Sequence, residues 1–369
     1  MHHHSTDAPA RSSVPGLAPA RSSASTWASV VAGLVGVVAL ALLVVSVDAP
    51  RADGATVSRS AVGAVTDRAT DRATDRATHA TTAARRTSDG CRVSRRGVPR
   101  CGAFFGAAHG ANTEPATLEP GRPLGVRRTY YTATQVDNAV RTARRDVRRG
   151  RLPWISLKLP HSWEQMVAGA GDGWARGLVR RLDKVPGPVW VAFHHEPEGD
   201  GDVQAWRRMQ ERLAPIVRRT ADNVGFTVIT TGWNQLYGDP AYRLGKIWPR
   251  GVKVDVAGFD VYNEYGVTKD GRTIREWPKM GAKYFRPFSR WAKRHDVAWG
   301  IAETGLTHEA AAAYPGWIRA TYRSLVRHGG VALSYFDTHL NAYGSWKLST
   351  PVKRRAFRST LRSSPRLTR

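Results

Sequence analysis

The chain has 369 residues, of which 41% are hydrophobic and 9% aromatic, and its mean hydropathy is −0.40. This composition excludes a fibrous protein, a disulfide-dense mini-protein and a protein with many membrane spans. Lys and Arg outnumber Asp and Glu by 56 to 30, which gives a formal net charge of +26. Of these residues, 43 basic and 23 acidic ones follow residue 100, so most of the excess belongs to the later, foldable part.

So basic a chain raises the question of nucleic-acid binding, because neutralised phosphates supply most of that affinity. The basic residues recur along helix-like stretches such as 141–149 and form no known nucleic-acid-binding motif. We therefore expect a solvated basic surface and no nucleic-acid partner. Attraction to an anionic cell envelope or an acidic glycan remains open.

Residues 27–47 form an uncharged apolar run of 21 residues. A helix needs about 20 such residues to cross a bilayer, whereas the apolar part of a signal peptide has about 7–15. The run predicts an uncleaved membrane anchor, with a cleaved signal as the alternative because 47–49 reads Val-Asp-Ala. Residues 1–26 would be a cytoplasmic tail or the n-region of the signal, and the rest of the chain would lie outside the cell or be secreted.

Residues 48–90 are predicted to form a disordered linker, because Thr-Asp-Arg-Ala repeats three times from residue 66 and large apolar residues are scarce. The remaining segment, 91–369, is expected to be one catalytic domain. The chain has two cysteines, Cys91 and Cys101, at its start. Outside the cytoplasm so close a pair predicts a structural disulfide.

Short β-branched or aromatic runs alternate with longer Arg-rich helical segments after residue 101. The expected strands are Gly102–Gly106, Gly125–Tyr131, Leu152–Leu159, Val189–His194, Phe226–Thr231, Val254–Tyr262, Val297–Ala302 and Val331–Phe336. The expected helices are Thr134–Arg149, Ser162–Lys184, Asp202–Asn223, Met280–His295, Thr307–His328 and Pro351–Arg362, with irregular first and fifth connections. This rhythm predicts a single (β/α)8 TIM barrel. A doubly wound sheet is the alternative, but no Gly-rich phosphate turn follows the first strand.

Function in such a barrel is expected at the carboxyl ends of the strands. The polar and aromatic residues that follow those ends are His109, His195, Glu196, Trp233, Asn234, Asp260, Tyr262 and Glu303. Glu196 and Glu303 end the fourth and seventh strands, nearly opposite each other across the ring. Two facing carboxylates are the minimal machinery of glycoside hydrolysis. A metal site is an alternative. Its ligands would be His194, His195, Glu196 and Glu198, but metal ligands usually come from several strands and only His109 offers a remote partner.

The joint placement of His195-Glu196-Pro197, Asp260-x-Tyr262 and Glu303-Thr304-Gly305 resembles the clan A (β/α)8 retaining glycoside hydrolases. A His directly before the acid/base Glu is similar to glycoside hydrolase family 26, the β-mannanase family. The resemblance covers about residues 101–350.

The resemblance implies that Glu196 is the general acid and base and that Glu303 is the nucleophile, oriented by Tyr262. Trp233, Asn234 and Asp260 would line the glycone subsite, and His195 would hold Glu196 or a substrate hydroxyl. His109 and Tyr262 are also expected to bind substrate. The expected partner is a polysaccharide, without a cofactor or a metal, and the expected state is a monomer. The alternatives are a non-catalytic barrel that binds envelope polysaccharide and a basic binder of nucleic acid or teichoic acid.

Overall fold

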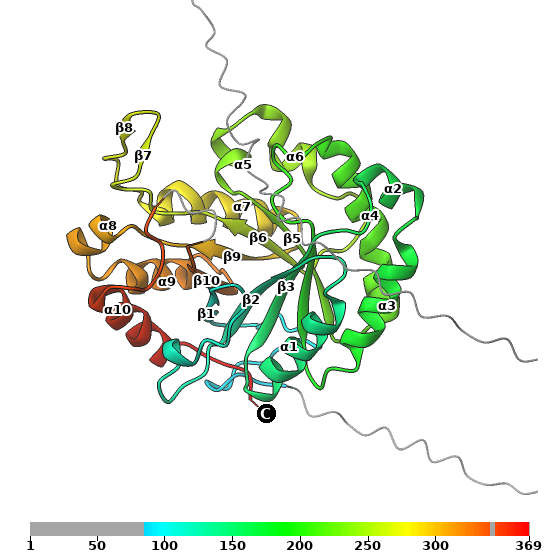
Figure 1. The fold of residues 1–369 in the computed structure, drawn as a ribbon, viewed down its shortest axis with the longest axis horizontal. Helices are drawn as coiled ribbons and strands as arrows, with labels where there is room; N and C mark the ends of the chain where they lie inside the picture. Colours follow the sequence, from blue (N-terminus) through cyan, green and yellow to red (C-terminus); the bar gives the residue numbers. More distant parts are fainter. Residues whose placement is uncertain (1–84, 340–343, 369) are drawn as a thin grey trace, which may run out of the picture. The chain divides into compact units, whose positions relative to one another are not determined.

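The computed structural model describes residues 85–339 and 344–368, in which eight parallel strands close into a barrel (Figure 1). The order around the barrel is β1-β10-β9-β6-β5-β4-β3-β2, which confirms the expected (β/α)8 fold. The barrel strands are β1 (Phe104–His109), β2 (Val126–Tyr131), β3 (Leu152–Leu157), β4 (Val189–Phe193), β5 (Val224–Thr230), β6 (Val256–Asp260), β9 (Ala298–Thr304) and β10 (Ala332–Asp337). Two short strands, β7 (Thr268–Lys269) and β8 (Arg272–Thr273), form a separate hairpin between β6 and β9.

Helices surround the sheet and cover its outer face (Figure 1). They are α1 (Val136–Arg148), α2 (Trp163–Ala168), α3 (Asp172–Asp183), α4 (Val203–Thr220), α5 (Trp233–Tyr237), α6 (Leu244–Ile247), α7 (Arg286–Arg294), α8 (His308–Ala313), α9 (Trp317–Arg327) and α10 (Pro351–Arg362). A π-helical turn, Gly281–Phe285, leads into α7. The first connection holds only the 3-10 turn Ala116–Leu118, and the fifth holds α5, α6 and the 3-10 turn Pro240–Tyr242, so both are irregular as expected.

Two segments that were expected to be single helices are each broken in two. Within 162–184 the break follows Gly169, which ends α2 in the left-handed region with φ of 99°. Glycine adopts this conformation without a Cβ clash, so it ends the helix. Within 307–328 the break falls at Tyr314, because Pro315 disfavours a helical conformation in the residue before it.

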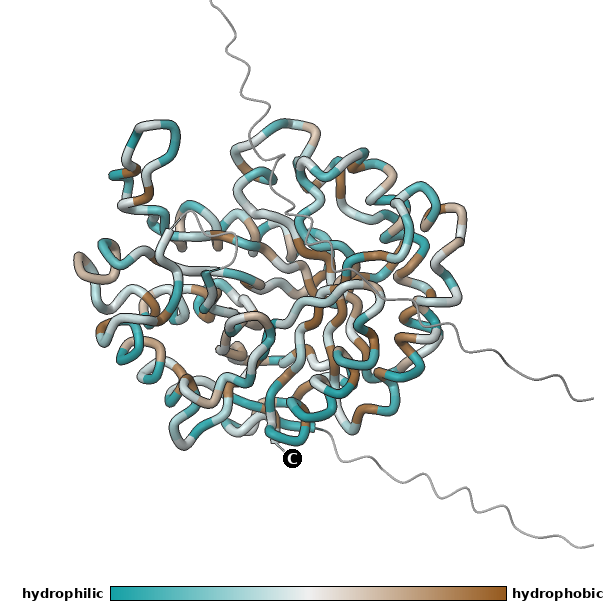
Figure 2. Tube along the Cα trace, viewed as in Figure 1, coloured by the Kyte–Doolittle hydropathy of each residue, from teal (hydrophilic) through white to brown (hydrophobic). Residues whose placement is uncertain are grey.

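The interior of the barrel is packed with large apolar side chains. Phe104, Val126, Trp154, Trp190 and Ile229 belong to one buried cluster contributed by five strands. The rings of Trp154 and Trp190 meet edge to face with centroids 5.0 Å apart. Figure 2 shows hydrophobic residues along the central strands and hydrophilic residues on the outer turns of the helices. The filled interior leaves the mouth at the carboxyl ends of the strands as the place for chemistry.

The linker was predicted to run to residue 90, but residues 85–90 pair with the domain. Arg86 forms a β-bridge with Arg92, and Thr87 forms one with Leu367 near the carboxyl terminus. The backbone polar groups of the segment thus find partners in the domain, which is the physical reason for its order. Residues 1–84, including the apolar run 27–47, lie outside the described residues. Within the described ranges, no helix is both long and apolar enough to cross a membrane.

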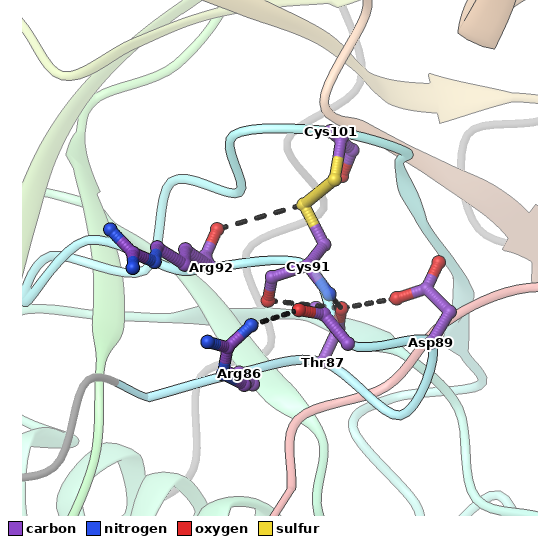
Figure 3. Close-up of a disulfide and its surroundings, with 7 residues drawn as sticks. Arg86, Thr87, Asp89, Cys91, Arg92 and Cys101 are labelled. Carbon is purple, nitrogen blue, oxygen red and sulfur yellow. Dashed lines mark hydrogen bonds between the residues drawn. A yellow bond between two sulfur atoms is a disulfide. The ribbon is translucent and has the colours of Figure 1, made fainter.

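Cys91 and Cys101 are joined by a disulfide, with their Cα atoms 5.8 Å apart (Figure 3). The backbone N–H of Cys91 donates to the Thr87 hydroxyl at 3.1 Å, and that hydroxyl in turn donates to Asp89. The bridge closes the loop directly before β1. It therefore holds the amino-terminal segment where it pairs with residues near the carboxyl terminus.

Candidate active site

The parallel strands bring the predicted residues to one mouth of the barrel. Asp260 and Glu303 lie at the carboxyl ends of β6 and β9, and Glu196 follows β4. Glu303 and Asp260 are buried, at 6% and 3% exposure, and Glu196 is half-buried. These three carboxyl groups are close enough for the charges of Glu303 and Glu196 to act on Asp260. The core of the site is thus an acidic cluster of three carboxyl groups that are largely shielded from solvent.

A β-bulge near the end of β9 brings Glu303 to the position opposite Asp260. Phe259 pairs with Ile301, and the next residue of β6, Asp260, pairs with Glu303, so that Ala302 is skipped. Such an extra residue bends a strand and redirects the side chains that follow it. Ala302 packs in the interior cluster, and the carboxyl of the very next residue, Glu303, also reaches groups at the mouth. Regular alternation would have sent these two side chains to opposite faces.

Both carboxylate oxygens of Glu303 accept a phenolic hydrogen bond. Tyr130 donates to Oε1 and Tyr262 donates to Oε2, each at 2.7 Å. The guanidinium of Arg128 lies 3.9 Å from Oε1. Burial, followed by the charge of Glu303, raises the pKa of each tyrosine well above its usual value, so both remain donors. This is an environment that stabilises a carboxylate anion and fixes its orientation.

Sequence reasoning identified Tyr262 but missed Arg128 and Tyr130, which both come from β2. Arg128 is 1% exposed and its Nη1 donates to the Ser156 hydroxyl at 2.7 Å. Its guanidinium carbon lies 4.6 Å from the centre of the Tyr130 ring. Nε and Nη2 have no hydrogen-bond partner among the described residues. Arg128 therefore supplies a buried positive charge beside the acidic cluster, and its Nε and Nη2 can donate further hydrogen bonds.

Glu196 differs from Glu303 because its side chain forms no hydrogen bond with any described residue. Burial, together with the charges of Glu303 and Glu198, raises the pKa of Glu196 to about 8. The side chain is therefore mostly protonated at neutral pH. Its backbone and that of His194 lie in the left-handed region, with φ of 51° and 49°. Non-glycine residues in this region are strained and concentrate at functional sites.

Glu198 is the other carboxyl on the same loop, and its side chain has hydrogen-bond partners that Glu196 lacks. It is 9% exposed, and its Oε1 accepts hydrogen bonds from the Thr231 backbone N–H at 3.2 Å and from the Gln235 amide. These contacts tie the loop after β4 to the start of the segment after β5. Glu198 thus stabilises the loop, and Glu196 is left available for chemistry.

The two histidines before Glu196 have different environments. Burial, followed by the charge of Arg128, lowers the pKa of His195 well below its usual value, so this ring is neutral. Its Nδ1 is buried without a hydrogen-bond partner in the described part of the chain, and its ring lies 5.5 Å from that of Tyr130. His194 instead contacts Asp200, with Nε2 2.8 Å from the carboxylate. His195 therefore belongs to the site, and His194 belongs to the surrounding loop.

Asp260 is buried with both carboxyl oxygens unpaired among the described side chains. Burial, followed by the charges of Glu303 and Glu196, raises the pKa of Asp260 well above its usual value. The protonated form, which this shift favours, can donate a hydrogen bond as well as accept one.

The remaining predicted residues lie around this cluster without contacting its carboxylates. His109 Nδ1 is paired with Asp337 at 2.5 Å, across the register between β1 and β10. Asn234 donates to the Thr231 hydroxyl at 3.0 Å. Trp233, at the start of α5, is 49% exposed. Substrate binding by these residues stays a prediction. In His109 the group that could bind a substrate is the second ring nitrogen, Nε2.

An unpredicted aromatic residue, Trp346, completes the mouth from the loop after β10. Its ring centroid lies 4.9 Å from that of Tyr262, and its own side chain is 4% exposed. Phe336, near the end of β10, also contacts the Tyr262 ring, edge to face with centroids 6.1 Å apart. The two rings hold Tyr262 in place. Trp346 could not be assigned from sequence, because nothing in the loop indicates where it folds back.

No group of three or more His, Cys, Asp or Glu side chains among the described residues has the arrangement of a metal site. Of the histidines near the mouth, His109 contacts Asp337 and His194 contacts Asp200.

No protein-family model matches the chain, and no curated protein matches its sequence. The structure resembles the exo-β-1,4-mannosidase Op5Man5 from Opitutaceae bacterium strain TAV5, with 15% identity, a TM-score of 0.52 and coverage of 75% of this chain and 62% of that one. It also resembles Cel5A from Thermotoga maritima in complex with cellobiose, with 14% identity, a TM-score of 0.50 and coverage of 69% and 96%. A family 26 β-mannanase from Bacteroides ovatus aligns with 15% identity, a TM-score of 0.49 and coverage of 72% and 89%.

At these identities the likenesses concern the fold. The chain has the (β/α)8 barrel that glycosidases such as Op5Man5 and Cel5A share. Its mouth carries the acidic cluster of Glu196, Asp260 and Glu303 where barrel enzymes hold their active sites.

Proposed function

We propose that this protein is a retaining glycosidase that hydrolyses O-glycosidic bonds of a β-glycan through a double displacement. The observation that carries the proposal is the contrast between its two glutamates. Glu303 accepts two phenolic hydrogen bonds beside Arg128, as an anionic nucleophile requires. Glu196 has a pKa of about 8, and its carboxyl forms no hydrogen bond with a described residue, as a general acid requires. Two carboxyl groups with opposite protonation are the machinery of this reaction class.

In the first step Glu303 attacks the anomeric carbon while Glu196 donates its proton to the glycosidic oxygen. The bond between the anomeric carbon and that oxygen breaks, the leaving alcohol departs, and a glycosyl ester forms on Glu303. The ester has no negative charge, so the repulsion that raised the pKa of Glu196 disappears and its pKa falls. Glu196, now ionised, takes a proton from water. The water oxygen displaces Glu303 from the anomeric carbon with net retention.

The remaining groups orient the reactants. Tyr130 and Tyr262 hold Glu303 in the direction of attack, and Arg128 stabilises its charge when it is released as a leaving group. His195 has a buried, unpaired Nδ1 that is available to a substrate hydroxyl. Trp233, Asn234 and His109 are proposed to line further sugar subsites.

We propose a β-1,4-linked substrate of the mannan type. The support is the resemblance of the motifs to the β-mannanase family and the barrel shared with a β-1,4-mannosidase and with a protein bound to cellobiose. We also propose that the domain works outside the cytoplasm, anchored through residues 27–47 or secreted after their cleavage. The Cys91–Cys101 disulfide supports this location, because such bonds persist in oxidising compartments.

The test is hydrolysis by the full chain on a panel of mannan, glucomannan, cellulose and xylan oligomers, followed by proton NMR of the first-formed anomer. Retention of configuration is expected, and hydrolysis is expected to disappear in Glu303→Gln. An inverted first product would contradict the double displacement. Binding of a glycan without any hydrolysis would favour the alternative, a non-catalytic barrel that binds envelope polysaccharide.

A further inference from the structure

The outer wall of the barrel has a groove between α9 and α10 that no step of the proposed hydrolysis uses. Its volume is about 350 Å³, and Arg319 of α9 and Arg355 of α10 line it. The groove is also lined by the small or apolar residues Pro315, Gly316 and Ala356. Arg319 and Arg355 are both exposed. The groove thus presents two guanidinium groups above an uncharged floor.

The two helices that form the groove carry no acidic residue. Neither α9 nor α10 contains Asp or Glu. Their arginines are Arg319, Arg323, Arg327, Arg354, Arg355, Arg358 and Arg362. None of the seven forms an ion pair with a described carboxylate, and the side chains of Arg354 and Arg358 donate to backbone carbonyls. The positive charge of this face is therefore not neutralised within the described part of the molecule.

Other arginines on the outer helices do have acidic partners. Arg212 pairs with Asp172 at 2.8 Å, and Arg218 pairs with Asp255 at 3.0 Å. Unpaired arginines also occur elsewhere, such as Arg141 and Arg144 of α1, but α9 and α10 are neighbouring helices and together hold seven of them. A concentration of one charge sign in a concave surface attracts counter-charged ligands.

The spacing of the arginines indicates a linear ligand. Arg319, Arg323 and Arg327 recur every four residues on the exposed face of α9, which corresponds to about 6 Å along the helix. An extended sugar chain with one charge per unit presents anions at a comparable interval. The guanidinium fork matches a carboxylate in a planar, bidentate geometry.

One exposed aromatic ring, that of Tyr314, lies next to Gly316, a residue that lines the groove. Tyr314 is 44% exposed. A ring of this kind offers a flat apolar face to a sugar. Single-stranded nucleic acid would favour several aromatic platforms along its path. The groove therefore suits a charged polysaccharide better than single-stranded nucleic acid.

We propose that the groove between α9 and α10 binds a linear polysaccharide that carries carboxylate groups on its sugars. The proposal rests on the proposed glycosidase function, because that function is the reason to expect the polymer to be a glycan. Both helices begin on the side where the strands end, so the first turns of α9 and α10 lie toward the mouth. A chain held there keeps the polymer beside the active site.

The test measures binding of fluorescently labelled linear polygalacturonate to the full chain by anisotropy. The variant Arg319→Ala with Arg355→Ala is expected to weaken binding by about tenfold, because each exposed charge pair contributes up to about 1 kcal/mol. Binding by the unchanged protein is expected to weaken as NaCl rises, and this salt dependence should be shallower in the variant. Arg319→Glu with Arg355→Glu should weaken binding further.

The matched control is Arg141→Ala with Arg144→Ala on α1, where both arginines are exposed and form no ion pair with a described residue. This control removes the same charge from another part of the wall and should change the affinity by less than about threefold. Equal weakening in the control, or no weakening in the groove variant, would overturn the proposal. Tighter binding of single-stranded DNA, poly(glycerol phosphate) or anionic vesicles at the same groove would overturn the choice of ligand.

A separate readout distinguishes this proposal from the glycosidase function. Hydrolysis of a neutral mannan oligomer is expected to be unchanged in the groove variant, because Arg319 and Arg355 do not belong to the mouth. If the unchanged protein binds polygalacturonate through the groove but hydrolyses no glycan, the proposed function fails and the groove remains. If it hydrolyses mannan but does not bind polygalacturonate, only the groove proposal fails.

Discussion

Tyr130 and Tyr262 donate hydrogen bonds to opposite oxygens of Glu303, each at 2.7 Å. They come from different parts of the barrel, since Tyr130 lies on β2 and Tyr262 follows β6. A carboxylate held from two sides has little freedom to rotate. The pair therefore presents Glu303 to the mouth in one orientation before any substrate arrives, as its proposed role as a nucleophile requires.

Removal of either phenol should slow the reaction without unfolding the protein. Tyr130→Phe and Tyr262→Phe each delete one hydrogen bond to a charged group, worth about 1.5–3 kcal/mol, and should lower kcat/KM by about 10- to 100-fold. The control is Tyr131→Phe. Tyr131 belongs to a buried apolar cluster with residues of α1, α3 and α4, so its substitution should leave kcat/KM unchanged. Steady-state kinetics on an aryl glycoside measure all three. Loss of activity in Tyr131→Phe alone would contradict the assigned orientation of β2.

Under the proposed mechanism, variants of Glu303 and Glu196 should differ in the leaving groups that they can still release. Glu303→Gln should abolish turnover of every substrate, because no nucleophile remains. Glu196→Ala should still release good leaving groups that need no proton, and added azide should restore turnover as a glycosyl azide of retained configuration. Product analysis by mass spectrometry and NMR checks the outcome. Azide rescue of Glu198→Ala instead would mean that the acid has been assigned to the wrong carboxyl.

The pH dependence of activity should follow Glu196. The proposed mechanism needs this group protonated in the free enzyme, so kcat/KM should fall as the pH rises through about 8. The charge of Glu198 contributes to that raised pKa, so Glu198→Gln should move the basic limb to lower pH. Profiles of kcat/KM against pH for the unchanged protein and for Glu198→Gln test the direction of this shift. A limb that moves upward in Glu198→Gln would contradict the electrostatic account.

Loss of the disulfide should reduce stability more than activity. Cys91 and Cys101 are ten positions apart, and closing a loop of that size stabilises a fold by roughly 2–3 kcal/mol through the unfolded chain. Cys91→Ser with Cys101→Ser should therefore lower the melting temperature, and kcat/KM below that temperature should be unchanged. The same drop should appear when the unchanged protein is melted with a reductant. An unchanged melting temperature in both experiments would show that the bridge contributes nothing.

The barrel and the two glutamates could be predicted because the relevant information is local and repeated. Eight apolar runs with helical segments between them permit few other folds, and parallel strands necessarily bring their carboxyl ends together. Placing Glu196 and Glu303 at the same mouth required only the ends of β4 and β9. Their proposed roles as acid and nucleophile rest on chemistry rather than on any detail of packing.

The choice between Glu196 and Glu198 required the folded protein. Both carboxyls follow β4 two residues apart, and sequence offers only a preference between them. The structure separates them because Glu198 is bound to Thr231 and Gln235 from the next connection. The end of α2 shows the same contrast at a smaller scale, since Gly169 breaks a segment whose apolar pattern continues through it.

The residues of β2 show most clearly where sequence information ends. Its sequence contains two adjacent pairs, Arg127-Arg128 and Tyr130-Tyr131, so composition alone does not show which member faces the barrel interior. A shift of one residue would exchange every side chain between the two faces. Pairing with β1 and β3 sets the register and places Arg128 and Tyr130 beside Glu303. Arg127 instead faces outward and pairs with Asp146 at 2.9 Å. The sequence does not distinguish two identical neighbours, so only contacts between distant parts of the chain decide which of them faces the interior.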